Sequence, residues 1–426
     1  MFAKITYLEK YLFAIPLLLV FVIEDYLLGS KILVVYSLLI LLRLILFYQK
    51  VAPVVILLIF ISSYVGPYFS HFFQGYDVSM WQSFNNSYYL SKAILIFSFF
   101  LYSILIFTKK NKDYVAIAKR LNVRPSTKIF YSSILIAFLL VQFGLSGETL
   151  LSGLDYGVIE YQRSALFEYS IFFFLISYTY SNKKKIQLYI LFSFISVLIL
   201  KDFIFGGRIT SLMLCLLIYL INFEYRVSNF KIFILIIVFI FVLNLVSLVR
   251  SNPLQFLQNG FDLELFYDFL FNGNKNKIII STEGDLAHSS ARIIGMIENN
   301  IISTTDRLKS LFYNIISIFT PGIELSELSN MSSYKKDVYG TGGGVLFPVS
   351  FYIWLSYPGV ILSGFIVSKM IKLFIETNSN RSIIYLLLVF SVFPRWFSYS
   401  TIVMFKLCVY GMLVFILFNS FKRIKQ

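Results

Sequence analysis

Charged residues are scarce in this sequence. Asp, Glu, Lys and Arg together make up only 14% of its 426 residues, whereas soluble domains carry about a quarter. Hydrophobic residues make up 58%, a share that excludes an ordinary soluble domain and indicates a polytopic membrane protein. The net charge of +15 does not indicate a nucleic-acid partner, because the basic residues lie in short loops between apolar runs.

Cysteine and histidine are scarce too, with two of each. Cys215 and Cys408 fall inside apolar runs, which predicts small core residues rather than a disulfide or a metal site. Two histidines and no clustered carboxylates leave too few metal ligands, so we expect neither a metal nor another cofactor. A cleavable leader is not visible, because the first apolar run lacks a small-residue cleavage site and continues into Glu24 and Asp25.

Long apolar runs fill most of the chain instead. A helix needs about twenty apolar residues to span a bilayer, and lipid-exposed backbone must form its hydrogen bonds internally. We therefore expect an all-α membrane protein with about twelve transmembrane helices. The predicted spans are residues 6–23, 31–48, 51–70, 89–108, 129–145, 165–181, 186–205, 209–223, 232–249, 345–368, 382–399 and 401–420.

One long segment, residues 250–344, contains no such run. The chain therefore divides into spans one to nine within residues 1–249, a large loop at 250–344, and spans ten to twelve within residues 345–426. Basic residues crowd the loops at 109–128 and 183–185, which places those loops and both termini in the cytoplasm. The large loop is then external, and its mixed acidic and basic composition agrees.

The large loop has helical signals of its own. Ser281-Thr282-Glu283 opens a helix that extends to about Ile302, and Ser303 with Asp306 has capping-box spacing for a second helix that ends before Thr320. We expect these two helices to roof a cavity between the spans. A short interfacial helix is predicted at 262–270, and Pro358-Gly359 predicts a kink of span ten near the cytoplasmic side.

Four arginines mark the external ends of spans at a similar depth. They are Arg163, Arg208, Arg250 and Arg395. A charge at the membrane edge is costly unless it is paired or functional, and the planar guanidinium binds a diphosphate bidentately. The alternative for each arginine is that it reaches out to lipid headgroups.

The first loop helix carries candidate catalytic groups. Asp285, His288 and Arg292 are spaced i, i+3 and i+7, so they share one helix face and could transfer a proton next to a bound anion. A solvated helix face is the alternative. Glu298 and Asp306 are further carboxylate candidates for this role.

A glycine-rich run, residues 340–344, directly precedes span ten. Its backbone N–H groups, those of Gly342 and Gly343 among them, could bind an anion at the start of a helix. The alternative is a plain hinge, because the Lys-Ser/Thr of a phosphate-binding P-loop is missing.

Several segments together resemble a known family. The matching pieces are Gly206-Gly207-Arg208 opening a span, Leu311-Phe312-Tyr313 leading to Phe319-Thr320-Pro321-Gly322, the run 340–344, and a span with Tyr357-Pro358-Gly359 and Gly364. Over residues 201–370 this layout resembles the Wzy-type O-antigen polymerases, which join oligosaccharide repeat units.

The resemblance implies a GT-C-like glycosyltransferase of the bacterial inner membrane. Such an enzyme polymerises undecaprenyl-diphosphate-linked repeat units into O-antigen or a related surface polysaccharide at the periplasmic face. It also implies functional arginines in the loops after spans five and nine, here Arg163, then Arg250 and Arg292. The implied partners are the lipid-linked glycan donor and acceptor, membrane lipid, a chain-length regulator and a flippase.

The resemblance also separates two related activities. The sister O-antigen ligases have a catalytic histidine followed eleven positions later by glycine, but the residue eleven positions after His288 is Asn299. That departure favours a polymerase. The hypothesis from the sequence gives the candidate residues two roles. The leaving diphosphate is bound and stabilised by Arg163, Arg208, Arg250 and Arg292, with Arg395, Gly342 and Gly343 nearby. The hydroxyl proton is taken by His288, Asp285 or Glu298. A flippase or exporter of lipid-linked oligosaccharides and a non-catalytic scaffold remain as alternatives.

Overall fold

The computed structural model describes residues 5–78, 86–109, 114–144, 165–204, 208–224, 234, 282–320, 325–331, 334–339 and 344–424. These residues form helices and no β-strand. Among them, six helical segments are long and apolar enough to cross a membrane: Tyr26–Phe47, Ala52–Gln74, Ser87–Phe107, Thr127–Gly144, Phe347–Glu376 and Ile402–Ser420. The chain is therefore an all-α polytopic membrane protein. Twelve spans and a GT-C-like arrangement remain predictions.

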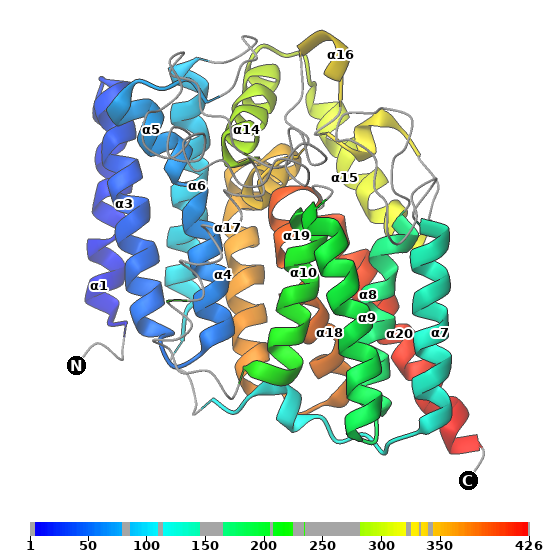
Figure 1. Cartoon of the computed structure of the whole chain (residues 1–426). Helices are drawn as coiled ribbons and strands as arrows, with labels where there is room; N and C mark the ends of the chain where they lie inside the picture. Colours follow the sequence, from blue (N-terminus) through cyan, green and yellow to red (C-terminus); the bar gives the residue numbers. More distant parts are fainter. Residues whose placement is uncertain are drawn as a thin grey trace, which may run out of the picture. The chain divides into compact units, whose positions relative to one another are not determined.

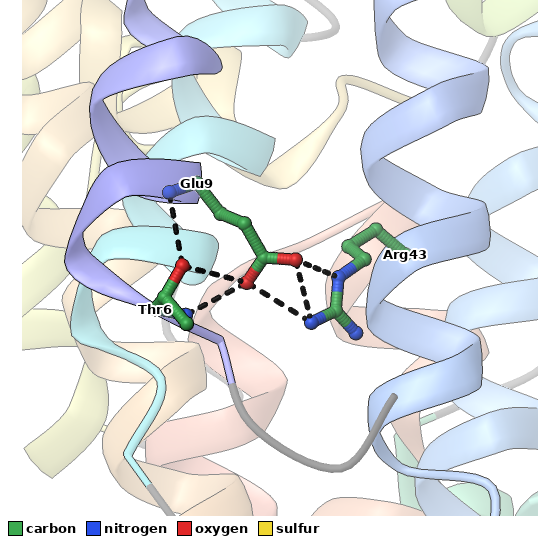
Figure 2. A network of polar contacts seen from close by, with 3 residues as sticks. All are labelled: Thr6, Glu9 and Arg43. Atoms are coloured by element: carbon green, nitrogen blue, oxygen red, sulfur yellow. Dashed lines mark hydrogen bonds and ion pairs between the residues drawn. The ribbon is translucent and has the colours of Figure 1, made fainter. Parts of the chain in front are cut away.

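The first apolar run forms two short helices, α1 (Tyr7–Leu12) and α2 (Ala14–Val20), where one continuous span was predicted. Pro16 explains the break, because it has no N–H to donate to the carbonyl of Leu12. Polar contacts hold α1 in place (Figure 2). Glu9 closes a capping box with Thr6, and its carboxylate accepts hydrogen bonds of 3.0 and 3.1 Å from Nη2 of Arg43 on α3 (Tyr26–Phe47).

Proline interrupts two further predicted spans for the same reason. Pro67 and Pro394 cannot donate to the carbonyls of Ser63 and Phe390, so in each case the chain starts a new helix. The span predicted over 51–70 is present as the membrane-length segment Ala52–Gln74 with a turn at residues 64–65, whereas the continuous helix predicted over 382–399 is wrong. The interrupted pairs are α4 (Ala52–Ser63) with α5 (Gly66–Gln74), and α18 (Asn380–Ser391) with α19 (Phe393–Ser398).

The other predicted spans in the described residues are helical. They are α6 (Ser87–Phe107), α7 (Thr127–Gly144), α8 (Ala165–Tyr180), α9 (Lys185–Ile204), α10 (Arg208–Ile218) continued by the π-helical turn η2 (Tyr219–Phe223), α17 (Phe347–Glu376) and α20 (Ile402–Ile424). Predicted span nine, residues 232–249, lies outside the described residues except for Ile234, and so does the interfacial helix predicted at 262–270.

Both predicted helices of the large loop are present: α14 (Thr282–Glu298) and α15 (Thr304–Phe319). Helix α14 ends before the predicted Ile302 because Asn300 adopts a left-handed backbone conformation, with φ of 57°. The capping box at the start of α15 is confirmed. Asp306 N donates to Ser303 Oγ at 3.1 Å, and the Asp306 carboxylate accepts from Ser303 N at 3.1 Å.

The helices in Figure 1 belong to two compact units. Unit 1 contains Met1–Tyr114, Asn274–Glu376 and Arg395–Ile402, and in it α6 packs against α3, α14 and α17. Unit 2 contains Val115–Gly273, Thr377–Pro394 and Val403–Gln426, and in it α7 packs on α8 and α10 on α9 and α18. The division of the chain at residues 250 and 345 remains a prediction.

Candidate functional site

Helix α14 is surrounded by protein within unit 1. It packs against α5, α6 and α17, and residues 286–296 are all buried. The alternative of a solvated helix face is therefore wrong. The side chains of His288, Ser289, Ser290 and Arg292 are completely inaccessible to solvent. Polar groups predicted to face water or a substrate thus lie in the core of unit 1.

The imidazole of His288 is held in an unusual environment. Neither ring nitrogen has a hydrogen-bond partner among the described residues. Burial, and then the positive charge of Arg292, lowers the pKa of His288 to about 4. The ring is therefore neutral at pH 7, and one of its nitrogens is an available proton acceptor.

Arg292 places a guanidinium in the same interior, one turn further along α14. Its Nη1 donates to the backbone carbonyl of Tyr334 at 3.4 Å. Burial lowers the pKa of Arg292 to about 10, so the side chain stays protonated at neutral pH. A buried cation of this kind is costly and points to a paired or functional group. Asp285, one turn before His288, is partly exposed.

Glu298 is engaged in an ion pair. Its carboxylate contacts Nζ of Lys92 on α6, and the Lys92 ammonium lies 4.5 Å from the ring centroid of Tyr88. Beside them, the Asn299 side chain donates to the hydroxyl of Tyr89 at 2.8 Å. The pair fastens the end of α14 to α6. Glu298 could serve as a base only after releasing Lys92, a residue that the sequence analysis did not select.

Asp306 has a structural role. Its carboxylate accepts hydrogen bonds from the Ser303 hydroxyl at 2.7 Å and from the Ser303 backbone, and these bonds lower the pKa of Asp306. A carboxylate that caps a helix and resists protonation is a weak candidate for proton transfer.

The remaining diphosphate candidates are only partly placed. Arg395 lies on α19, with its guanidinium carbon 5.4 Å from the ring centroid of Tyr399. Arg208 begins α10, and only its backbone is described. Whether the arginines gather around one ligand remains a prediction. The residues outside the described part are Arg163, Arg250, Gly342 and Gly343.

A second feature of unit 1 is the break in α17. Ser356 has φ of 57° and ψ of −148°, and Pro358 has no N–H to donate, so the helical hydrogen bonds fail here. Arg307 of α15 replaces them: its Nε donates to the carbonyl of Ile353 at 2.5 Å and its Nη2 to that of Tyr352 at 3.0 Å. The predicted kink is present. It lies beside α15, whose Arg307 contacts it, and the cytoplasmic location expected for it remains a prediction.

Gly359 follows this break for a steric reason. A Cβ atom at Gly359 would collide with the backbone carbonyl oxygen of Phe351. Arg307 itself had no sequence signal, because its partners are backbone carbonyls 45 and 46 residues away. A guanidinium with several fixed donors suits two neighbouring carbonyls better than an ammonium does.

Comparison with known proteins adds no identification: no protein-family model, no curated protein and no solved structure matches the chain. In the described residues, no three His, Cys, Asp or Glu side chains are grouped so that they could hold a metal ion. The candidate site is therefore defined by its own groups, a buried imidazole and a buried guanidinium on α14.

Proposed function

We propose that this chain polymerises undecaprenyl-diphosphate-linked oligosaccharide repeat units into O-antigen or a related surface polysaccharide, as the resemblance to Wzy-type polymerases implies. The reaction belongs at the periplasmic face of the bacterial inner membrane, with both termini cytoplasmic. A hydroxyl of the acceptor attacks the anomeric carbon of the donor. The bond from that carbon to the diphosphate oxygen breaks, undecaprenyl diphosphate leaves, and a base takes the hydroxyl proton.

The observation that carries the proposal is the burial of Arg292 on a helix that packs against the membrane spans α6 and α17. A fixed positive charge in a water-poor site stabilises negative charge that develops on a leaving diphosphate more strongly than it would in water. Twelve spans and a GT-C-like fold belong to the same proposal, and the six long apolar helices of the described residues support its membrane part.

His288 fits the role of the base once the anion is bound. The Arg292 charge contributes to the low pKa of His288. A diphosphate next to Arg292 offsets that charge, which raises the pKa of His288 toward its ordinary value and makes the imidazole a better proton acceptor. Asp285, partly exposed one turn away, is the second candidate.

The test uses purified full-length protein in liposomes supplied with lipid-linked repeat units. A polymer ladder without added nucleotide supports polymerisation, whereas movement of the lipid across the bilayer without a ladder supports the flippase alternative and overturns the proposal. Arg292→Lys should lower ladder formation by roughly 100-fold, the usual loss when an oxyanion donor is removed.

A matched control separates this loss from misfolding. Arg120→Lys makes the same substitution at a partly buried arginine of unit 2, whose Nη1 donates to the carbonyl of Thr377 at 2.6 Å. We expect this variant to retain its ladder. Equal loss in both variants would mean that lysine is generally not tolerated at buried arginines, and the diphosphate role of Arg292 would lose its support.

A further inference from the structure

Helix α15 carries an exposed apolar stripe. Leu308, Phe312, Ile315 and Phe319 are 55%, 60%, 50% and 77% exposed. Their spacing of i, i+4, i+7 and i+11 places all four on one side of the helix. A contiguous apolar surface on a helix outside the predicted spans requires a partner or an apolar environment.

The side of α15 that faces the protein makes polar contacts. Arg307, Ser310 and Asn314, spaced i, i+3 and i+7, make its contacts. Arg307 binds two carbonyls of α17, Ser310 accepts a hydrogen bond of 3.2 Å from Nε1 of Trp354, and the Asn314 amide donates to the carbonyl of Ser329 at 3.2 Å. These hydrogen bonds fix the rotation of the helix, so the apolar stripe cannot turn inward without breaking them.

This arrangement is the reverse of a helix in water, which buries its apolar side and exposes its polar side. It is the arrangement expected of an element in contact with lipid. The contacts of α15 reach residues 352–354 of α17, a predicted membrane span, and the next residue of that span, Leu355, is itself 40% exposed. An exposed apolar side chain of a predicted span thus lies at the level at which α15 is attached, which is where lipid is expected.

We propose that α15 is an interfacial helix whose stripe of Leu308, Phe312, Ile315 and Phe319 is embedded in the acyl chains of one bilayer leaflet. One exposed polar residue fits this position: Lys309 lies beside the stripe, where its ammonium can reach the headgroup phosphates. The occupant of the surface is membrane lipid. This inference does not depend on the reaction that the protein catalyses.

Spin labelling of the full-length protein in nanodiscs tests the proposal. Both native cysteines, Cys215 and Cys408, are replaced by alanine, and a nitroxide is attached at Phe312→Cys or Ile315→Cys, with Lys309→Cys as the matched exposed control. We expect labels at the two stripe positions to collide with oxygen several-fold more, relative to a water-soluble nickel complex, than the label at the control position.

Two outcomes would overturn the proposal. Stripe labels as accessible to the nickel complex as the control would place α15 in water, and labels shielded from both reagents would mean that a second copy or another protein segment covers the stripe.

A measurement on the unmodified chain guards against misfolded variants. Phospholipids with a photoreactive acyl chain should label residues 308–319 as well as the spans, and labelling of the spans alone also refutes the inference.

Discussion

The contact between α6 and α17 depends on one glycine. It supports the candidate site, because α14 packs on both helices. At Gly364 a Cβ atom would collide with Cβ of Ser103 and would lie 2.9 Å from the carbonyl oxygen of Phe100 and 3.1 Å from the amide nitrogen of Ile104. Small residues at such crossings let membrane helices approach closely. We predict that Gly364→Ala destabilises the protein.

The expected size of the effect follows from two opposing terms. Ordinary carbon contacts lie at about 3.5–4.0 Å, so the two helices would have to separate by roughly 1 Å at the crossing. Overpacking of this kind typically costs about 1–3 kcal/mol. The higher helix propensity of alanine returns about 1 kcal/mol at most. The collision with Cβ of Ser103 together with two close backbone atoms belongs to the upper part of that range, so we expect a net loss of about 1–2 kcal/mol in the free energy of unfolding.

A matched control isolates the steric term. Gly29 lies within the span helix α3, but a Cβ atom there meets a single side-chain atom, Cγ1 of Val20, at an ordinary 3.4 Å. Gly29→Ala should be neutral or stabilising by up to about 1 kcal/mol. Denaturant titration in mixed micelles, followed by the fluorescence of the buried Trp354 and Trp396, gives both values.

The result that would refute this reasoning is a Gly364→Ala protein as stable as the wild type. In that case α17 and α6 do not approach as closely as described. The double variant Gly364→Ala/Ser103→Gly removes the nearest side-chain collision while leaving the backbone contact with Phe100, so partial recovery of stability is expected.

Two further predictions use the same unfolding measurement. Arg307→Ala leaves the carbonyls of Tyr352 and Ile353 without their donor and should lower the free energy of unfolding by roughly 2–4 kcal/mol. Lys309→Ala, at an exposed position of the same helix, should change it by less than about 0.5 kcal/mol. Equal values for the two variants would mean that Arg307 does not stabilise the break in α17. The pKa of His288 is about 4 in the folded protein and near 6.5 in the unfolded chain, so the unfolded chain binds the proton first as the pH falls. The free energy of unfolding should therefore decrease by roughly 3 kcal/mol from pH 7 to pH 4. His288→Gln should lack this decrease, and parallel pH profiles of the two proteins would contradict a buried neutral imidazole.

Local features of the fold were predictable because their causes are local. The capping box at Ser303 needs only two residues three positions apart, and it is present. The breaks at Pro16, Pro67 and Pro394 also had a visible cause, but the prediction gave priority to long apolar runs over single prolines. Hydropathy describes where a segment lies, whereas proline decides whether its helix is continuous.

The burial of α14 has a signal in the sequence besides its charged residues. Ala287, Ala291 and Gly295 recur every four residues, the small-residue spacing that lets helices pack closely. The polar residues on the helix suggested a solvated face instead. The ion pair between Lys92 and Glu298 could not have been predicted in this way, because 206 residues separate its partners and only the fold brings them together.

The two loop helices differ in which side chains they bury. Helix α14 keeps His288 and Arg292 inside the protein, and α15 turns Arg307 inward while exposing Phe312. Helix α14 also buries its apolar side chains, among them Ile293 and Ile294, so only α15 shows the exposed apolar stripe that a hydrocarbon environment favours. The expectation that both helices roof a cavity between the spans remains a prediction. Helix α14 extends the helical core of unit 1, because it packs against α5, α6 and α17 and its residues 286–296 are all buried.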